Sequence, residues 1–132
     1  YIVLTENLET LIQGELDHIA GDMRIETALD VSGAEQPVSP EIKMTVLRIC
    51  QEALNNIKKH AHASQVKAAL TYSLHGISFY VQDNGVGFDP QIPAPSNYGL
   101  TFIGERARLV GGSVVINSEI GKGTKIYVSI PL

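Results

Sequence analysis

The chain has 132 residues, of which 44% are hydrophobic and 18% charged, which is enough for one core and too few for two ordinary domains. Its formal net charge of -4 argues against nucleic acid held through its phosphates, and its single cysteine excludes a disulfide framework. No apolar run approaches the ~20 residues of a membrane-spanning helix. We therefore expect a single domain over residues 1–132 that works in the cytoplasm, without nucleic acid and without direct membrane contact. The start at Tyr1 indicates a piece of a longer parent, which can carry its own membrane anchor.

The first half of the chain predicts a helix, a strand and a longer helix. Apolar residues at helical spacing predict the first helix from about Thr5 to Ile19, closed by Gly21. Strict alternation then predicts a strand over residues 23–31. The pair Ser39-Pro40 supplies an N-cap and a first-turn proline for the second helix, which should end near residues 60–63.

The second half predicts four strands and one more helix. Two alternating runs, 65–73 and 77–83, are joined by a short hairpin loop, and the last two strands cover 113–119 and 124–131. Between the two pairs lie a proline-bearing segment over about 88–98 and a helix over 99–110 that is stopped by two glycines. This order favours an α+β fold, a two-layer sandwich with helices on one face of a mixed, mostly antiparallel sheet.

The second helix carries an unusual set of polar side chains. Glu52, Asn56 and Lys59 are separated by steps of four and three residues, so an α-helix places them on one stripe within about 60° of arc. The stripe borders the apolar face, where a ligand can reach it. His60 lies next to it, toward the apolar arc, and is open to two interpretations: a ligand contact or a core histidine.

A second group of polar residues follows the strand 77–83. Asp83 is in phase with the core-facing residues of that strand, and a buried carboxylate is costly unless a donor reaches it. Gly85 and Gly87 remove side chains where a ligand can approach the backbone, although Asn84-Gly85 is also a common hairpin turn. Thr124 has the same core-facing phase in the last strand and is a second polar contact.

One more glycine lies at the start of the third helix. Gly99 leaves free N–H groups there, which suit a phosphate, although a simple helix start explains it equally.

Four stretches together resemble the ATP-binding domain of the GHKL group. "QEALNNIKKHAHA" resembles the N box, "DNGVGF" the first glycine box, "NYGL" a reduced second glycine box, and "GKGTKIYVSIPL" the closing strand. The wording of the N box and the short lid, about 88–98, are similar to sensor histidine kinases that partner DNA-binding response regulators. The resemblance implies a Bergerat-type fold and the cofactors ATP and Mg²⁺.

The resemblance also implies roles at the phosphate end of the site. Asn56 would bind Mg²⁺, and Lys59 and His60 would contact the phosphates. Glu52 would be the catalytic residue near the γ-phosphate, where it orients or deprotonates the nucleophile.

At the base end, Asp83 would accept from the adenine amine and Thr124 would reach the base through water. The residues that would shape the pocket and lid are Gly85, Gly87, Gly99 and Leu100.

The resemblance implies an ATP-dependent histidine kinase whose acceptor histidine lies on a separate dimerisation domain, absent from this chain. The partners would be those dimerisation and phosphoacceptor helices and a response regulator. Two alternatives use the same fold: a serine kinase that binds and inhibits a sigma factor, and an ATP-gated clamp of the gyrase and mismatch-repair kind. A third belongs to a different class, a non-catalytic regulatory module whose conformation responds to ATP. His18 lies on a short helix just before a strand and does not fit an acceptor, so the chain alone is not expected to autophosphorylate.

Overall fold

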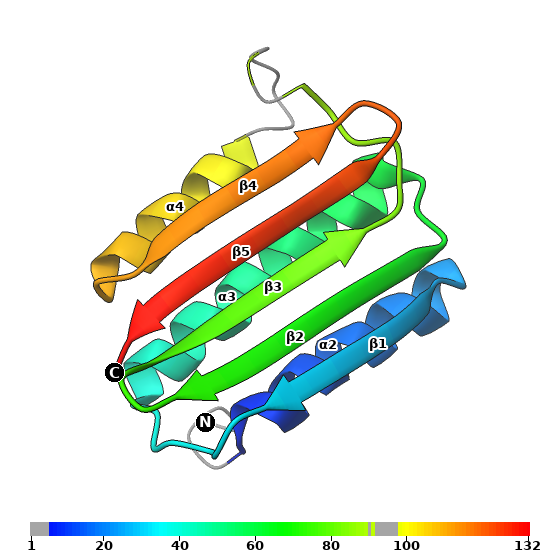
Figure 1. The fold of residues 1–132 in the computed structure, drawn as a ribbon. Helices are drawn as coiled ribbons and strands as arrows, with labels where there is room; N and C mark the ends of the chain where they lie inside the picture. The colour runs from blue at the N-terminus through cyan, green and yellow to red at the C-terminus, as the bar shows by residue number, and fades with distance from the viewer. Residues whose placement is uncertain (1–5, 90, 92–97) are drawn as a thin grey trace.

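A mixed sheet forms one layer of the structure and the helices form the other (Figure 1). The computed structural model describes residues 6–89, 91 and 98–132. In these ranges the elements are, in chain order, α2 (Leu8–Met23), β1 (Glu26–Ser32), α3 (Pro40–Asn56), the π-helical turn η1 (Ile57–Ala61), β2 (Gln65–Ser73), β3 (Gly76–Asp83), α4 (Tyr98–Leu109), β4 (Ser113–Glu119) and β5 (Gly123–Pro131).

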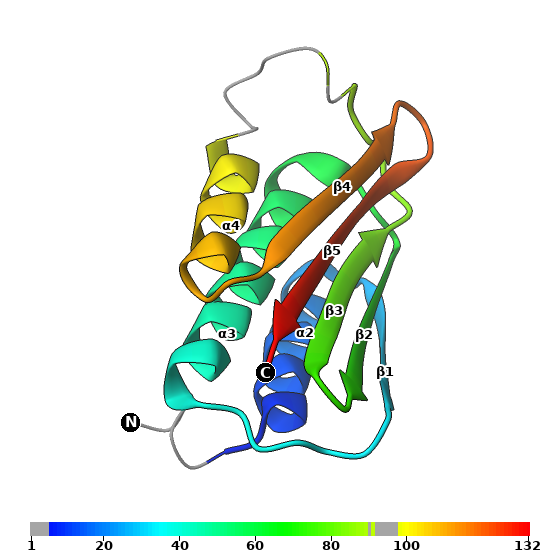
Figure 2. The same cartoon turned by 60° about the vertical axis from the view of Figure 1, so that its left-hand side comes forward.

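The sheet has the strand order β1-β2-β3-β5-β4. β1 pairs with β2 in parallel, and the other three pairs are antiparallel. All helices cover the same face, as the rotated view makes plain (Figure 2). The predicted α+β sandwich with a mixed, mostly antiparallel sheet is therefore confirmed.

α2 begins and ends later than the sequence predicts. The side chain of Asn7 caps its first turn by accepting from the Thr10 amide at 2.9 Å. The helix continues through Gly21 and stops only where Arg24 adopts a left-handed conformation with φ of 54°. The predicted stop at Gly21 is wrong because a helix tolerates one glycine at a cost of about 1 kcal/mol. As a result, the first strand begins at Glu26 instead of residue 23.

α3 has the predicted cap. Ser39 Oγ accepts from the Ile42 amide at 3.2 Å, and Pro40 is the first helical residue. The helix passes directly into η1, which ends at His62 in a left-handed conformation, so the predicted end near residues 60–63 is confirmed. The π-helical turn itself is not visible in the sequence pattern.

α4 ends at the two predicted glycines. The amide of Gly112 donates to the Ala107 carbonyl at 2.8 Å, and the amide of Gly111 donates to the Arg108 carbonyl at 3.0 Å. This pair of bonds is a Schellman motif, and the φ of +77° at Gly111 is the left-handed conformation that the motif requires.

Three polar contacts link α2 to α3. Lys43 Nζ donates to the Glu6 carbonyl at 2.9 Å and Gln51 Nε2 to Glu15 Oε1 at 3.0 Å. Lys58 in η1 forms an ion pair with Asp22 at 2.5 Å. The sequence separations are 37, 36 and 36 residues, so the two helices run side by side in the same direction.

The core lies between the two layers. It combines one stripe from each helix with alternate residues of the strands. The largest of its fully buried side chains are Leu8, Ile12, Leu16, Ile49, Leu70, Ile103 and Ile130. In the part of the chain that the structure describes, no helix combines the length and hydropathy needed to cross a bilayer.

Candidate functional site

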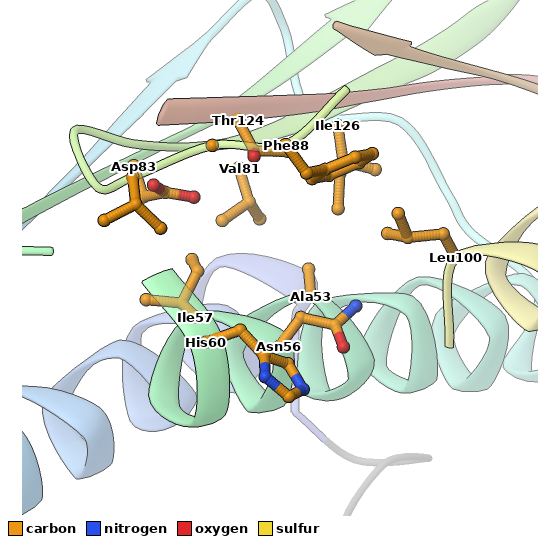
Figure 3. A pocket seen from close by; sticks show the side chains of 12 residues that line it. Ala53, Asn56, Ile57, His60, Val81, Asp83, Phe88, Leu100, Thr124 and Ile126 are labelled. Atoms are coloured by element: carbon orange, nitrogen blue, oxygen red, sulfur yellow. The ribbon is translucent and has the colours of Figure 1, made fainter. Parts of the chain in front are cut away.

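A pocket of about 630 Å³ opens between the helix layer and the sheet. Its lining comes from four places: the end of α3 with η1, the strands β3 and β5, the segment after β3, and the first turn of α4 (Figure 3). The lining residues are Ala53, Asn56, Ile57, His60, Val81, Asp83, Val86, Gly87, Phe88, Leu100, Thr124 and Ile126.

Asp83 is the one charged residue in the described core and lies in the sheet-side wall of the pocket, where only 5% of it is exposed. Its Oδ1 accepts from the Gly85 amide at 2.8 Å. Burial raises the pKa of this carboxyl, and the backbone N–H groups of Gly85 and Thr124 offset only part of that shift. The core-facing phase predicted for Asp83 is confirmed, and its carboxylate has acceptor capacity left for a ligand.

The segment after Asp83 is not a hairpin turn. Asn84 Oδ1 accepts from the amides of Ser64 and Gln65 at 2.9 and 3.0 Å, and its Nδ2 donates to Ser64 Oγ at 2.9 Å. β3 pairs only with β2 and the distant β5. The hairpin interpretation of Asn84-Gly85 is therefore wrong, because Asn84 instead fastens this segment to the loop before β2.

Gly87 lies in the pocket wall and packs against the turn between β4 and β5. Its φ is +64°, and a Cβ there would stand 2.1 Å from the Glu119 carbonyl oxygen. The amide of Gly121 also donates to the Val86 carbonyl at 2.6 Å. The glycine is thus required by a close backbone approach inside the protein, whatever ligand lies on its other side.

Thr124 has the predicted core-facing phase and lies in the pocket wall near Asp83 and Phe88 (Figure 3). Its Oγ1 is 2.8 Å from Ser118 Oγ, the residue opposite it in the register of β4 and β5. Sequence reasoning missed Ser118 and Phe88. The sequence alone does not single out Ser118, because its contact with Thr124 depends on how β4 pairs with β5.

On the helix side, Asn56 and His60 face the pocket. The Asn56 Nδ2 is buried without a hydrogen-bond partner, which costs roughly 1–3 kcal/mol unless a ligand uses the amide. His60 lines the pocket and is exposed, so its interpretation as a core histidine is wrong.

Lys59 is exposed and does not line the pocket. The π-helical turn supplies the reason. An α-helix brings the third residue after Asn56 onto the same stripe, whereas η1 has i→i+5 hydrogen bonds and more residues per turn. The wider turn carries Lys59 off the predicted stripe and leaves His60 over the pocket.

Glu52 also lies outside the pocket. It lines a second hollow of about 680 Å³ between α3 and α4, together with Arg48, Gln51, Asn55, Phe102 and Arg106. The guanidinium of Arg106 stands 4.2 Å from the centre of the Phe102 ring, and its Nε is buried without a partner. Glu52 and Asn56 are thus on neighbouring turns of α3 but face different hollows.

The remaining predicted positions lie near the start of α4. Leu100 is 9% exposed and lines the pocket, while Gly85 contributes its amide to Asp83 without lining the pocket. Gly99 lies in the first turn of α4. The lid predicted over about 88–98 lies largely outside the described residues.

The polar groups that line the pocket fit a nucleotide with a magnesium ion. One end of the pocket offers a buried acceptor and the other an unpartnered amide, next to His60. Among the described residues, no group of three His, Cys, Asp or Glu side chains can hold a metal alone. The side-chain oxygen of an asparagine such as Asn56 can serve as one protein ligand of Mg²⁺, whose remaining ligands are then phosphates and water.

Comparison with known proteins decides the family. Residues 41–132 match the family of histidine kinase-, DNA gyrase B- and HSP90-like ATPases. The chain belongs to this family. The relationship that the sequence motifs predict is confirmed.

Two curated relatives are histidine kinases. The chain is 34% identical over 117 residues to the sensor histidine kinase LiaS of Bacillus subtilis, covering 89% of this chain and 32% of that protein. It is 34% identical over 91 residues to the signal transduction histidine-protein kinase/phosphatase DegS of Brevibacillus brevis, covering 69% of this chain and 24% of that protein. The chain therefore spans about a third and a quarter of their lengths.

Solved structures share the fold at lower identity. The histidine kinase domain of the blue-light activated kinase of Erythrobacter litoralis matches with a TM-score of 0.70 at 21% identity, covering 95% of this chain and 59% of that chain. The mycobacterial sensor histidine kinase MprB matches with a TM-score of 0.69 at 18% identity, covering 96% and 95% of the two chains.

Proposed function

We propose that this domain binds Mg-ATP in the pocket and donates the γ-phosphate to a histidine on the dimerisation helices of a parent sensor histidine kinase. One observation carries the proposal. In a chain of this ATPase family, the buried carboxylate of Asp83 and the unpartnered amide of Asn56 line the same pocket.

Asp83 defines the base end of this assignment. A buried carboxylate that keeps free acceptor capacity favours a ligand with an N–H group, such as the exocyclic amine of adenine. The apolar side chains of Val81 and Ile126 flank it and suit the faces of a purine ring. Thr124 adds a hydroxyl within reach of bridging water.

The phosphate end would lie along the end of α3. The Asn56 amide can be turned to present oxygen to Mg²⁺, because the two ends of an amide have nearly the same shape. The ion neutralises phosphate charge when bound, and the exposed side chains of His60 and Lys59 can add hydrogen bonds and positive charge there. Leu100 closes this wall from the first turn of α4.

The acceptor helix would dock in the second hollow. Glu52 is proposed to act on the acceptor histidine, and it faces the space between α3 and α4 instead of the nucleotide pocket. Arg48 and Arg106 make no ion pair within the described residues, so they can receive an acidic side chain of the incoming helix. Phe102, 44% exposed, offers that helix an apolar contact.

In this arrangement the γ-phosphate would extend from the pocket past the end of α3 to meet the acceptor histidine, because transfer requires the two reacting atoms to lie in line and about 3 Å apart. Asn56 would hold the metal on one side and Glu52 would orient or deprotonate the histidine on the other, one turn away. The phosphorylated parent would then serve a response regulator in the cytoplasm, where ATP is available.

Nucleotide binding tests the base end. Titration calorimetry with Mg-ATP and Mg-GTP should give preferential binding of ATP to the unmodified domain, and Asp83→Asn should weaken ATP because it removes the charged acceptor. Asp30→Asn is the matched control, since Asp30 is exposed on the edge strand β1. Equal affinity for both nucleotides, or no loss in Asp83→Asn, would remove Asp83 from the base site.

Phosphoryl transfer tests the acceptor side. With radiolabelled ATP, the isolated domain should remain unlabelled, while the parent's upstream helical segment supplied in trans should gain alkali-stable, acid-labile label. Glu52→Ala should slow that step by roughly 10²–10⁴-fold while changing ATP affinity little. Glu35→Ala, at an exposed loop position, is the control.

Two results would contradict this proposal. Acid-stable label on the partner would indicate a serine kinase. Label on His18 of the isolated chain would show that the acceptor lies within this domain.

A further inference from the structure

Ser118 lies behind the pocket wall and makes three polar contacts with residues on different segments. Its Oγ accepts from the Phe88 amide at 2.8 Å. The same oxygen is 3.2 Å from the Gly123 carbonyl oxygen and 2.8 Å from Thr124 Oγ1. Ser118 is half-buried, and it does not itself line the pocket.

Counting protons leaves one arrangement for these contacts. A serine hydroxyl has one donor and two acceptor lone pairs. The Gly123 carbonyl can only accept, so the Ser118 proton must point to it. Both lone pairs of Ser118 then receive protons, one from the Phe88 amide and one from the Thr124 hydroxyl. All three contacts are hydrogen bonds only if Thr124 donates to Ser118.

This arrangement decides what Thr124 offers to a ligand. The single hydroxyl proton of Thr124 is donated to Ser118, on the side away from the pocket. The Thr124 oxygen can therefore present only lone pairs to a ligand. The neighbouring carboxylate of Asp83 is also an acceptor. The polar groups at this end of the pocket are therefore both acceptors, and they match a ligand edge or a bridging water that donates.

We propose that Ser118 is a positioning residue that holds Thr124 as an acceptor and thereby makes the pocket select a 6-amino purine over a 6-oxo purine. This inference rests on the proposed function, in which the base lies against Asp83. An amino group at C6 donates to acceptors, whereas a carbonyl oxygen at C6 faces them with lone pairs of its own. A site made to bond an N–H group rejects the analogue that lacks it, because its buried polar groups are left unpaired.

Inosine triphosphate is the sharpest probe of this selection. It keeps the ribose, the phosphates and the purine frame of ATP. It exchanges the amino group at C6 for a carbonyl, which also puts a proton on N1 and reverses the donor and acceptor pattern of that edge. It also avoids the second amino group that guanine carries. The ratio of Mg-ATP to Mg-ITP affinity therefore reports the donor and acceptor pattern of this end of the pocket and little else.

The key variant is Ser118→Ala. Loss of the Ser118 oxygen frees the Thr124 proton, which can then turn into the pocket and donate to a 6-oxo group. We expect the preference for ATP over ITP, measured by calorimetry, to fall roughly tenfold, the equivalent of one ordinary hydrogen bond. Ser129→Ala is the matched control, since Ser129 is an exposed serine on β5 and does not line the pocket.

Thr124→Val gives an independent measurement that leaves the Phe88–Ser118 bond in place. It should also lower the ATP-to-ITP ratio, and Ser118→Ala should then add no further change in the Thr124→Val background. A residue that only supports the loop around Phe88 would instead weaken both nucleotides equally in either background.

The outcomes separate the two levels of the proposal. Loss of the preference in Ser118→Ala and Thr124→Val, without additivity, supports the role of Ser118. If Asp83→Asn abolishes the preference and Ser118→Ala leaves it unchanged, the role of Ser118 is overturned while the base site stands. The same holds if the effects of Ser118→Ala and Thr124→Val on the preference simply add. If the unmodified domain does not prefer ATP over ITP, the proposed base site itself fails.

Discussion

Gly87→Ala should destabilise the domain before any ligand is considered. The residue has a φ of +64°, and an added Cβ would stand 2.1 Å from the Glu119 carbonyl oxygen and 2.9 Å from that of Gly123. Both neighbours are backbone atoms, at the end of β4 and the start of β5, so no side chain can rotate away to relieve the overlap.

The magnitude follows from two contributions. A left-handed conformation costs an L-residue roughly 1–2 kcal/mol, and forcing a methyl group into packed backbone costs about 1–3 kcal/mol more. The expected loss is thus about 2–5 kcal/mol, a large share of the roughly 5–15 kcal/mol that stabilises a typical domain. At roughly 3–5 °C per kcal/mol for a chain of this size, the melting temperature should fall by at least about 6 °C.

Gly104→Ala is the matched control because the same atom is added in a different setting. Gly104 lies within α4, and a Cβ there would meet nothing within 4 Å. This variant should gain roughly 0.5–1 kcal/mol from helix propensity. Calorimetric or fluorescence melting of the two variants without nucleotide is the assay. Equal melting temperatures for the Gly87→Ala and Gly104→Ala variants would refute the backbone reasoning. A Gly87→Ala domain with an unchanged melting temperature that no longer binds nucleotide would assign the glycine to ligand contact alone.

Three further changes test the pocket and its helix. Burial holds the folded-state pKa of Asp83 above its unfolded value, so its stabilising contribution is complete below the unfolded pKa and is lost as pH rises through the folded pKa. Nucleotide-free Asp83→Asn should therefore be more stable than the unmodified domain at pH 7 in urea titrations, with a difference that shrinks as pH is lowered. Asn56→Ala should lower Mg-ATP affinity roughly tenfold or more in calorimetry. The melting temperature of the nucleotide-free domain should stay unchanged or rise, because the substitution removes an unpartnered buried group. Ser39→Ala removes the α3 cap and should cost about 1 kcal/mol in urea denaturation without a change in nucleotide affinity.

The parts of the site that the sequence predicted are those set by local periodicity. Alternation along a strand repeats every two residues, so the phases of Asp83 and Thr124 could be assigned without knowing any partner strand. Cap chemistry is equally local, which is why Ser39 and Gly111 marked their helix ends correctly.

The parts that failed depend on contacts between elements. The helical stripe assumed uniform α-helix geometry, and the π-helical turn moved Lys59 off it. The packing position of α4 against α3 put Phe102 and Arg106 beside Glu52, and no pattern in either helix specifies that position. Ser118 became visible as a functional residue only when the register of β4 against β5 was known.

The direction of α3 affects the electrostatics of the pocket. α3 and η1 end beside the pocket, and the carbonyl end of this helix brings partial negative charge that would repel phosphate. Lys59 and His60 are exposed in η1 at that same end, where they offset it, whereas Lys58 is paired with Asp22. α4 runs the other way, so its amide end, at Leu100, is the one that meets the pocket. The ends of α3 and α4 that meet at the pocket therefore act in opposite senses on an anion there.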